Sequence, residues 1–405
     1  MRPSILTRLT QHWSILALLA IFGYALSRRL QELRAAISMP LWPDAVTVFR
    51  IAQNMRYPYD TGVREPLWPW LVKLFLWVFG TSEASVRYFS LTISLIGLYV
   101  AYRFIRDYTG YAGLALLVLS LLALNPYLTM LSVQGLRIEL YMVTLLVLGY
   151  YVFVPRLSPW RRHVGLAAST TLAALTQLNS VTIAAPLLVW AVWRHRLNWR
   201  TVGIVLGLAS LVVLPHLINS TLQFGDPLWS INAHAIFYRN YEYMAIKKTG
   251  CDGCPSAEEY SRSSYSGKRV TTFQYVFGMH SLREVFSRMG EGYLSVYVKR
   301  RGLLQYVLGT GRRPVWLLYL VGLAGLAAGR FRELLILPVL ELNLLAFVVR
   351  LDLDPRLIIH TAPVAALATA LPGWYVARLL VSRLNSLRYH LWPGQHRAPV
   401  PEDDE

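Results

Sequence analysis

Long uninterrupted blocks of apolar residues are the feature that most constrains how this chain can fold. A block of about 16 to 20 apolar residues can cross a bilayer as a helix, which satisfies its own backbone hydrogen bonds. Hydrophobic residues make up 55% of the 405 residues and charged residues only 15%, a balance that excludes an ordinary soluble protein. The blocks predict an all-α polytopic membrane protein with about ten transmembrane helices. The expected spans are residues 13–27, 86–105, 111–129, 136–154, 163–178, 180–194, 201–218, 314–329, 334–349 and 357–381.

Arginines in the short loops set the expected orientation. Loops rich in Lys and Arg stay on the inner side of a membrane, so the loops that carry these arginines are expected inside, together with both chain ends. No small-residue cleavage site follows the first span, which is therefore expected to remain as an anchor. The same topological role accounts for the formal charge of +18, so no nucleic-acid partner is expected. The arginines that set the expected orientation are Arg156, Arg161, Arg162, Arg194, Arg196, Arg200, Arg330, Arg332, Arg383 and Arg388.

The apolar run Leu67–Phe79 does not fit this scheme as another span. It has about 13 residues, too few to cross a bilayer, and Lys73 lies in its middle. It predicts an embedded or re-entrant helix. Arg28, Arg29 and Arg34 follow the first span on the expected outer side, where charge constrains a long loop only weakly.

This topology predicts one membrane core with two large extracytoplasmic loops. The N-terminal core covers residues 1–218 and includes the first loop, 28–85. The second loop covers 219–313, the last transmembrane helices lie in 314–381, and 382–405 form a cytoplasmic tail. Any chemistry is expected on the extracytoplasmic face of the cell (inner) membrane, because the inner connectors are short.

The first outer loop contains the earliest candidate site. Asp44 follows Pro43 at the start of an amphipathic stretch, a pattern that fits either a helix cap or a general base held at the membrane surface. Arg64 and Glu65 lie later in the same loop, just before the short apolar run. Their presence favours a functional role for Asp44.

Three further outer connectors carry polar residues. Arg137 and Glu139 lie at the mouth of a span and fit either an interfacial ion pair or a site, because a carboxylate that opens an apolar helix is costly without a partner. Gln177 and Asn179 fit the polar turn of a helical hairpin. Arg356 follows a weak Asp-Leu-Asp metal-binding pattern, and an arginine at the outer end of a span can bind a lipid phosphate through two hydrogen bonds.

The second large loop contains the only two cysteines, Cys251 and Cys254. Two thiols cannot complete a zinc site, and outside the cytoplasm a disulfide loop is the favoured interpretation. His234 and Tyr238 lie earlier in the loop and are candidate substrate contacts.

The order of these pieces resembles the GT-C superfamily of glycosyltransferases, which includes protein O-mannosyltransferases and the aminoarabinose transferase of lipid A. The resemblance covers about 330 residues, from Leu41 to Leu371. It rests on the first-loop acid and on the segments EPLWPWLVKLFLWVFG, SEASVRYFSLTISLIGL, LNPYLTMLSVQGLRIELYMVTLL, FGDPLWSINAHAIFYRNYEY and DPRLIIHTAPVAALATA. The last segment reads RLIIH where the family pattern begins RY.

The resemblance implies an inverting glycosyltransferase that moves a sugar from a polyprenyl phosphate or diphosphate to a lipid, glycan or protein acceptor. It assigns Asp44, Glu139 and Glu65 to catalysis and Arg356 to the donor phosphate. No cofactor is certain, although the three acids could together hold a divalent metal. The further expected substrate contacts are Arg137, Arg64, His234 and Tyr238.

Two other functions fit part of the pattern. A flippase-type transporter usually has an internal repeat and charged or broken helices at mid-membrane, whereas this sequence shows no repeat and its acids cluster in the outer loops. A lipid-linked glycan polymerase or ligase would use a large outer loop with Arg and His, such as residues 219–313. The acid in the first loop argues against the polymerase, whose chemistry lies later in the chain.

Overall fold

The computed structural model describes residues 5–62, 64–227, 274, 278–294, 304–329, 331–340, 356 and 358–391. Every regular element in these residues is a helix, which confirms an all-α polytopic membrane protein. In this described part, four helices are long and apolar enough to cross a membrane, or five if two helices joined at a sharp bend form one span. The expected number of ten spans is not confirmed.

Most of the described helices overlap the predicted apolar spans, and two further helices lie within the expected second outer loop, 219–313. The four longest are α1 (Ile5–Ala36), α4 (Glu83–Thr109), α10 (Trp199–Phe224) and α18 (Ala362–Leu391). The shorter ones are α5 (Ala112–Leu124), α6 (Pro126–Leu131), α7 (Ile138–Phe153), α8 (Pro159–Thr176), η1 (Leu178–Ser180), α9 (Val181–His195), α14 (Leu282–Leu294), α15 (Leu304–Leu308), α16 (Arg313–Ala328), η7 (Arg332–Leu335) and η9 (Ile359–Thr361).

The short apolar helix α3 has the limits that the sequence predicts, Leu67–Phe79. It follows Pro66 and ends at Gly80, whose φ of 91° is rare for a residue with a side chain. Trp68 is fully buried, whereas Trp77, on the opposite face, is 83% exposed. A helix that is apolar on its exposed face as well as its buried one is suited to contact lipid.

Helix α2 (Pro43–Asn54) packs beside α3 and holds the first-loop acid. The ammonium group of Lys73, in the middle of α3, donates a hydrogen bond to the backbone carbonyl of Met55, just after the end of α2. A charge on an apolar helix thereby gains an acceptor, and the two short helices are joined.

Helix α1 continues nine residues beyond the predicted end of the first span at residue 27, to Ala36. The charge that seemed to end the span is instead buried: Arg29 is 0% exposed and donates from Nε to Ser94 Oγ at 3.0 Å and from Nη1 to the carbonyl oxygen of Ala25 at 3.4 Å. Since Arg29 finds partners inside the bundle, no break in the helix is needed there.

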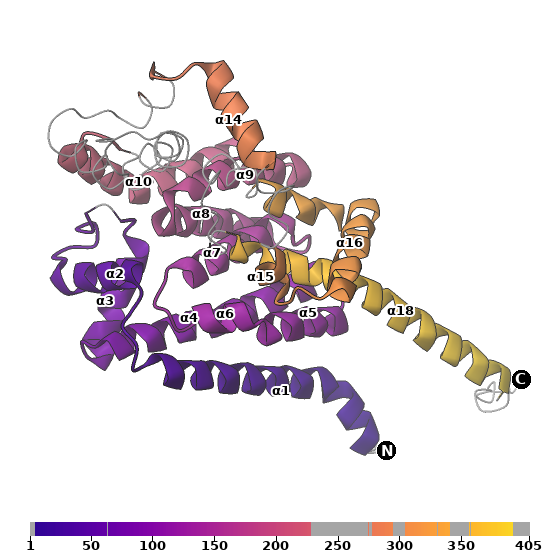
Figure 1. The fold of residues 1–405 in the computed structure, drawn as a ribbon. Coiled ribbons are helices and arrows are strands. Elements are labelled where there is room, and N and C mark those ends of the chain that lie inside the picture. The colour runs from indigo at the N-terminus through magenta and orange to yellow at the C-terminus, as the bar shows by residue number, and fades with distance from the viewer. Residues whose placement is uncertain are drawn as a thin grey trace, which may run out of the picture.

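The core of the bundle is formed by α4, α5, α7 and α8, with α7 packed between α4 and α8 (Figure 1). Helix α1 lies along one side of this core, and α16 crosses α18 closely on another. The N-terminal end of α1 and the C-terminal end of α18 project from the same side of the molecule, away from α2 and α3 (Figure 1).

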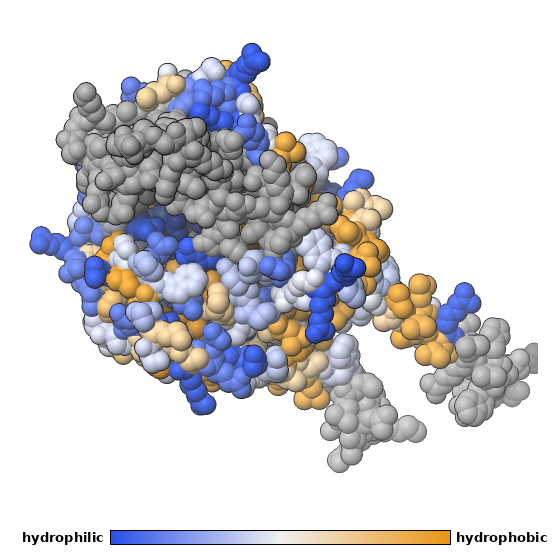
Figure 2. Space-filling view, in the orientation of Figure 1, coloured by the Kyte–Doolittle hydropathy of each residue, from blue (hydrophilic) through white to orange (hydrophobic). Residues whose placement is uncertain are grey.

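The projecting part of α18 is largely apolar (Figure 2). Val376, Leu379, Leu380 and Leu384 are each more than half exposed there. Such a surface on a helix long enough to span a membrane is expected to face lipid.

Candidate active site

Asp44 lies in the first turn of α2 and is paired with two arginines. Its Oδ1 accepts a hydrogen bond from Arg64 Nη2 at 3.0 Å, and its Oδ2 lies 3.5 Å from Arg356 Nη1. The structure thus brings together three predicted site residues from distant parts of the chain, which we call the Asp44 cluster. The residue at the N-cap of α2 is Trp42, and no side-chain hydrogen bond caps this helix end, so Asp44 is not a mere cap.

The Asp44 cluster is open to solvent and carries excess positive charge. The side chain of Asp44 is 52% exposed, that of Arg64 29% and that of Arg356 25%. Two positive charges against one negative charge leave a net charge of +1. A ligand with an anionic group can therefore approach the arginines without any opening of the bundle.

Aromatic packing positions one of the two arginines. The guanidinium carbon of Arg356 lies 5.0 Å from the ring centroid of Trp42, a cation–π contact. Trp42 immediately precedes α2, so the same residue orients Arg356 and begins the helix that carries Asp44. Sequence reasoning did not single out Trp42, although an aromatic residue two positions before the acid was a usable signal.

The loop that carries Arg64 is anchored to α10 and to itself. The Tyr59 hydroxyl donates to the carbonyl of Val212 at 2.7 Å, and Asn219 Nδ2 donates to the carbonyl of Tyr59 at 2.9 Å. Thr61 Oγ1 donates to the carbonyl of Arg64 at 2.6 Å. These bonds fix the backbone from which the Arg64 side chain reaches Asp44.

Glu65 and Arg137, both predicted site residues, form an ion pair with each other. The Glu65 side chain is 2% exposed, and its second oxygen, Oε1, accepts a hydrogen bond from the backbone N–H of Leu178 at 3.1 Å. Leu178 belongs to the turn between α8 and α9, which is where Gln177 and Asn179 predict a polar hairpin turn. Glu65 therefore connects the first loop to the start of α7 and to this turn through buried contacts.

Glu139 is also buried, in the first turn of α7, with 1% exposure. Arg29 on α1 acts on it electrostatically and donates to Ser94 of α4, but neither Glu139 oxygen has a hydrogen-bond partner within the described residues. Glu139 thus belongs to a buried group that joins three helices. Its expected catalytic role stays a prediction.

The expectation that Asp44, Glu65 and Glu139 hold a metal together is not supported by their positions. Within the described residues, no three side chains of His, Cys, Asp or Glu lie close enough to hold a metal ion. Asp44 is exposed on α2, Glu65 is buried in its ion pair with Arg137, and Glu139 is buried at the start of α7. Glu65, which already has a cationic partner, has less need of a metal.

His216 on α10 is a buried polar residue that sequence reasoning missed. It is 1% exposed, and neither ring nitrogen has a hydrogen-bond partner in the described part of the chain. It lies within electrostatic range of Glu65. A histidine inside the apolar block 201–218 was the available signal, because polar residues within membrane spans tend to be functional.

Residues 63–219 match the dolichyl-phosphate-mannose-protein mannosyltransferase family. The match confirms the resemblance to the GT-C superfamily, and it supports a membrane glycosyltransferase of the mannosyltransferase type. No curated protein and no solved structure matches the chain.

The mannosyltransferase match covers only part of the site. Arg64, Glu65, Arg137 and Glu139 lie within the matched segment, whereas Asp44 precedes it and Arg356 follows it. The expected contacts His234 and Tyr238 lie outside the described residues, as do Cys251, Cys254 and the Asp-Leu-Asp sequence before Arg356.

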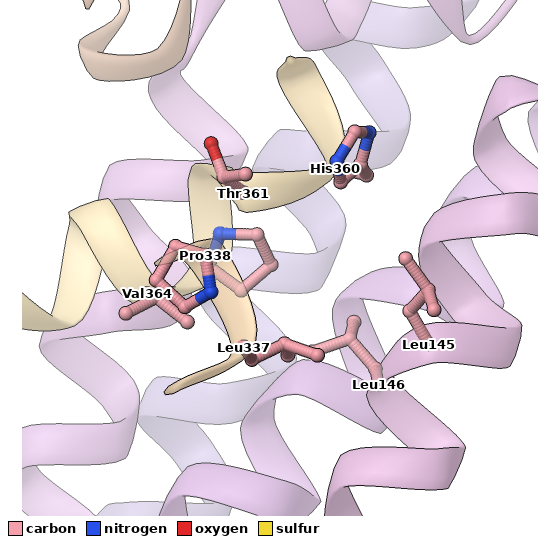
Figure 3. A pocket seen from close by; sticks show the side chains of 8 residues that line it. Leu145, Leu146, Leu337, Pro338, His360, Thr361 and Val364 are labelled. Atoms are coloured by element: carbon pink, nitrogen blue, oxygen red, sulfur yellow. The ribbon is translucent and has the colours of Figure 1, made fainter. Parts of the chain in front are cut away.

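A small apolar pocket lies between α7, which belongs to the matched segment, and the start of α18 (Figure 3). Its polar members are His360 and Thr361, a few residues after Arg356. The His360 ring meets the Tyr141 ring edge-on, with centroids 5.2 Å apart. This packing ties the Arg356 segment to α7. The other residues that line the pocket are Leu145, Leu146, Leu337, Pro338, Pro363 and Val364.

Proposed function

We propose that this protein is an inverting glycosyltransferase that moves a sugar, with mannose the first candidate, from a polyprenyl phosphate to an acceptor on the extracytoplasmic face of the membrane. The observation that carries the proposal is the Asp44 cluster, in which an exposed carboxylate lies between two arginines. The match of residues 63–219 to the dolichyl-phosphate-mannose-protein mannosyltransferase family supports the reaction class.

The Asp44 cluster contains the groups that such a transfer requires. An acceptor hydroxyl oxygen attacks the anomeric carbon, and the bond from that carbon to the phosphate oxygen breaks. Asp44 takes the hydroxyl proton, and the bonding electron pair leaves on the phosphate, which Arg356 and Arg64 neutralise. A single displacement of this kind inverts the anomeric configuration.

Donor binding would free Asp44 for this role. In the structure both arginines are held by the carboxylate, at 3.0 Å and 3.5 Å. Phosphate oxygens form charge-assisted bonds to guanidinium groups as readily as a carboxylate does, so a bound donor phosphate draws the arginines away. The carboxylate then accepts from the acceptor hydroxyl.

The buried ion pair of Glu65 and Arg137 holds the neighbouring residue Arg64 in position. Glu65 is the next residue after Arg64, and its burial with Arg137 and the Leu178 N–H fixes the Arg64 backbone. We therefore assign Glu65 and Arg137 to positioning Arg64.

The arrangement of the helices supports the proposed side of the membrane. The Asp44 cluster lies at the end of the molecule opposite the projecting ends of α1 and α18 (Figure 1). If both chain ends are inside, as the arginine-rich loops predict, α2 and the cluster lie outside.

The test is transfer by membranes that contain the protein, with mannosyl polyprenyl phosphate as donor and the endogenous acceptors of the producing cell. Asp44→Asn keeps the shape but removes the base, and transfer is expected to fall by about 10²- to 10⁴-fold. Asp60→Asn is the matched control, because Asp60 lies in the same loop and its side chain accepts a local hydrogen bond from the Arg56 N–H. Mass spectrometry of lipid extracts and surface glycans from cells with and without the protein then identifies the sugar and the acceptor.

Full activity of Asp44→Asn would remove Asp44 from the mechanism. Loss of activity in both variants to the same extent would assign the effect to the loop rather than to the base.

A further inference from the structure

We propose that a groove between α9 and η7, which is lined by none of the residues of the Asp44 cluster, binds the headgroup of an anionic phospholipid. The groove is lined by Trp190, Trp193, Arg194, Arg332, Glu333 and Ile336, and it encloses about 880 Å³ of space including its open face. This inference does not depend on the proposed glycosyl transfer.

The groove forms where two arginine-rich connectors meet. Arg194 lies in the last turn of α9, and Arg332 and Glu333 lie in η7, almost 140 residues later in the chain. Arg194 Nε donates to Glu333 Oε1 at 3.0 Å, which joins the two connectors. Both connectors are expected on the inner side of the membrane, where anionic lipids attract arginines.

The charge of the groove favours an anion. Two arginines and one glutamate leave the lining with a net charge of +1. Arg332 is exposed, and the side chain of Arg194 is 53% exposed although it is paired. A phosphodiester offers two oxygens to such guanidinium groups, which is the geometry that arginine binds best.

The tryptophans and the apolar continuation of the groove favour a lipid over free phosphate. The rings of Trp190 and Trp193 have centroids 5.0 Å apart, and Trp193 is 70% exposed. Indole rings concentrate at the level of the headgroups in membranes. Val189, one turn before Trp193, is 65% exposed, and Val339, one turn after Ile336, is 50% exposed. The groove therefore has a charged end for a phosphate and apolar faces that lead away from it for an acyl chain.

The test uses the full-length protein in a nonionic detergent, with phosphatidylglycerol as the anionic lipid and phosphatidylcholine as the neutral one. Native mass spectrometry measures retained lipid, and the thermal unfolding midpoint measures stabilisation. Phosphatidylglycerol is expected to be retained and to raise the midpoint. Arg332→Gln is expected to weaken its binding about five- to tenfold. Inorganic phosphate alone, which has no tail, is expected to have little effect.

Two further variants separate lipid binding from a purely structural ion pair. Glu333→Gln frees Arg194 and raises the net charge of the lining, so phosphatidylglycerol is expected to bind more tightly even if the lipid-free protein becomes less stable. Arg383→Gln removes an exposed arginine from α18, outside the groove, and is expected to bind the lipid normally. Equal retention of both lipids, or an equal loss in Arg332→Gln and Arg383→Gln, would overturn the proposal.

Discussion

The three carboxylates that the GT-C resemblance assigns to catalysis do not share one environment. Asp44 is more than half exposed between two arginines, whereas Glu65 and Glu139 are almost completely buried, each near one arginine. Exclusion of water strengthens the attraction within a buried pair but also makes an unpaired partner costly. Of the three, Asp44 is therefore the acid that can exchange its partners at the least cost to the bundle.

This difference predicts a stability effect at Glu65 that Asp44 does not share. Glu65→Gln leaves Arg137 without its ion pair, and the free energy of unfolding is expected to fall by about 3 kcal/mol. Asp44→Asn breaks an exposed pair and is expected to cost less than about 1 kcal/mol. Denaturant unfolding in mixed micelles measures both values.

A double-mutant cycle separates the pair itself from other effects at Glu65. The variant that combines Glu65→Gln with Arg137→Gln is expected to lose clearly less than the sum of the two single losses, because it leaves no unpaired charge. Additive losses would show that the two side chains do not stabilise the fold through each other.

At the scale of helices, the sequence predicts an element well where its limits are set locally. Helix α3 begins and ends as predicted because Pro66 and Gly80 mark its limits. The predicted span 111–129 is instead broken into α5 and α6 at Asn125, before Pro126. Asn125 Nδ2 donates to the carbonyls of Tyr306 and Val307, at 3.0 Å and 3.1 Å, and these distant partners cannot be read from the local pattern.

The contacts in the candidate site also join residues that are far apart in the sequence. The sequence indicates Asp44, Arg64 and Arg356 as separate candidates, but their contact joins positions up to 312 residues apart. The burial of Glu65 depends on the turn at Leu178, which lies 113 residues away. Residue type and local spacing suggest which groups carry chemistry, whereas only the packed helices show which groups pair.

The crossing of α16 and α18 yields a prediction about one glycine. A Cβ atom added at Gly322 would lie 1.7 Å from the backbone oxygen of Ala368, so the helices would have to separate. Gly322→Ala is expected to lower the free energy of unfolding by about 3 kcal/mol, since backbone cannot move aside as a side chain can. The shift of the thermal unfolding midpoint measures the effect.

Gly325, one turn later on α16, is the matched control. A Cβ atom there meets nothing within 4 Å, so Gly325→Ala is expected to be neutral or to stabilise by up to about 1 kcal/mol through helix propensity. Equal effects of the two substitutions would contradict a close crossing at Gly322.

For the whole molecule, helix length alone does not give the number of membrane crossings. The 16 residues of α7 rise about 24 Å, less than the roughly 30 Å of a bilayer core. Yet α7 is buried between α4 and α8, so much of its surface meets protein rather than lipid. Interior helices of this kind can be shorter than a lipid-facing span, and length alone is a weak criterion for them.

The side of the membrane on which each end of the molecule lies can be tested more directly than the number of crossings. The ends of α1 and α18 project together, away from α2, so positions near them are expected to be accessible from one side and α2 from the other (Figure 1). Single cysteines test this in a background in which Cys251 and Cys254 are replaced by serine. Asn54→Cys, at the end of α2, is expected to react with a membrane-impermeant maleimide on intact cells.

Two positions report on the opposite side. Trp160 is 74% exposed at the start of α8, beside the arginines of a short loop, and Ser382 is exposed near the end of α18. Trp160→Cys and Ser382→Cys are expected to react only after the cells are permeabilised, because positive loops stay inside. Labelling of Asn54→Cys and Ser382→Cys from the same side would place the Asp44 cluster on the face of the chain ends, and an extracytoplasmic active site would then be wrong whatever the number of spans.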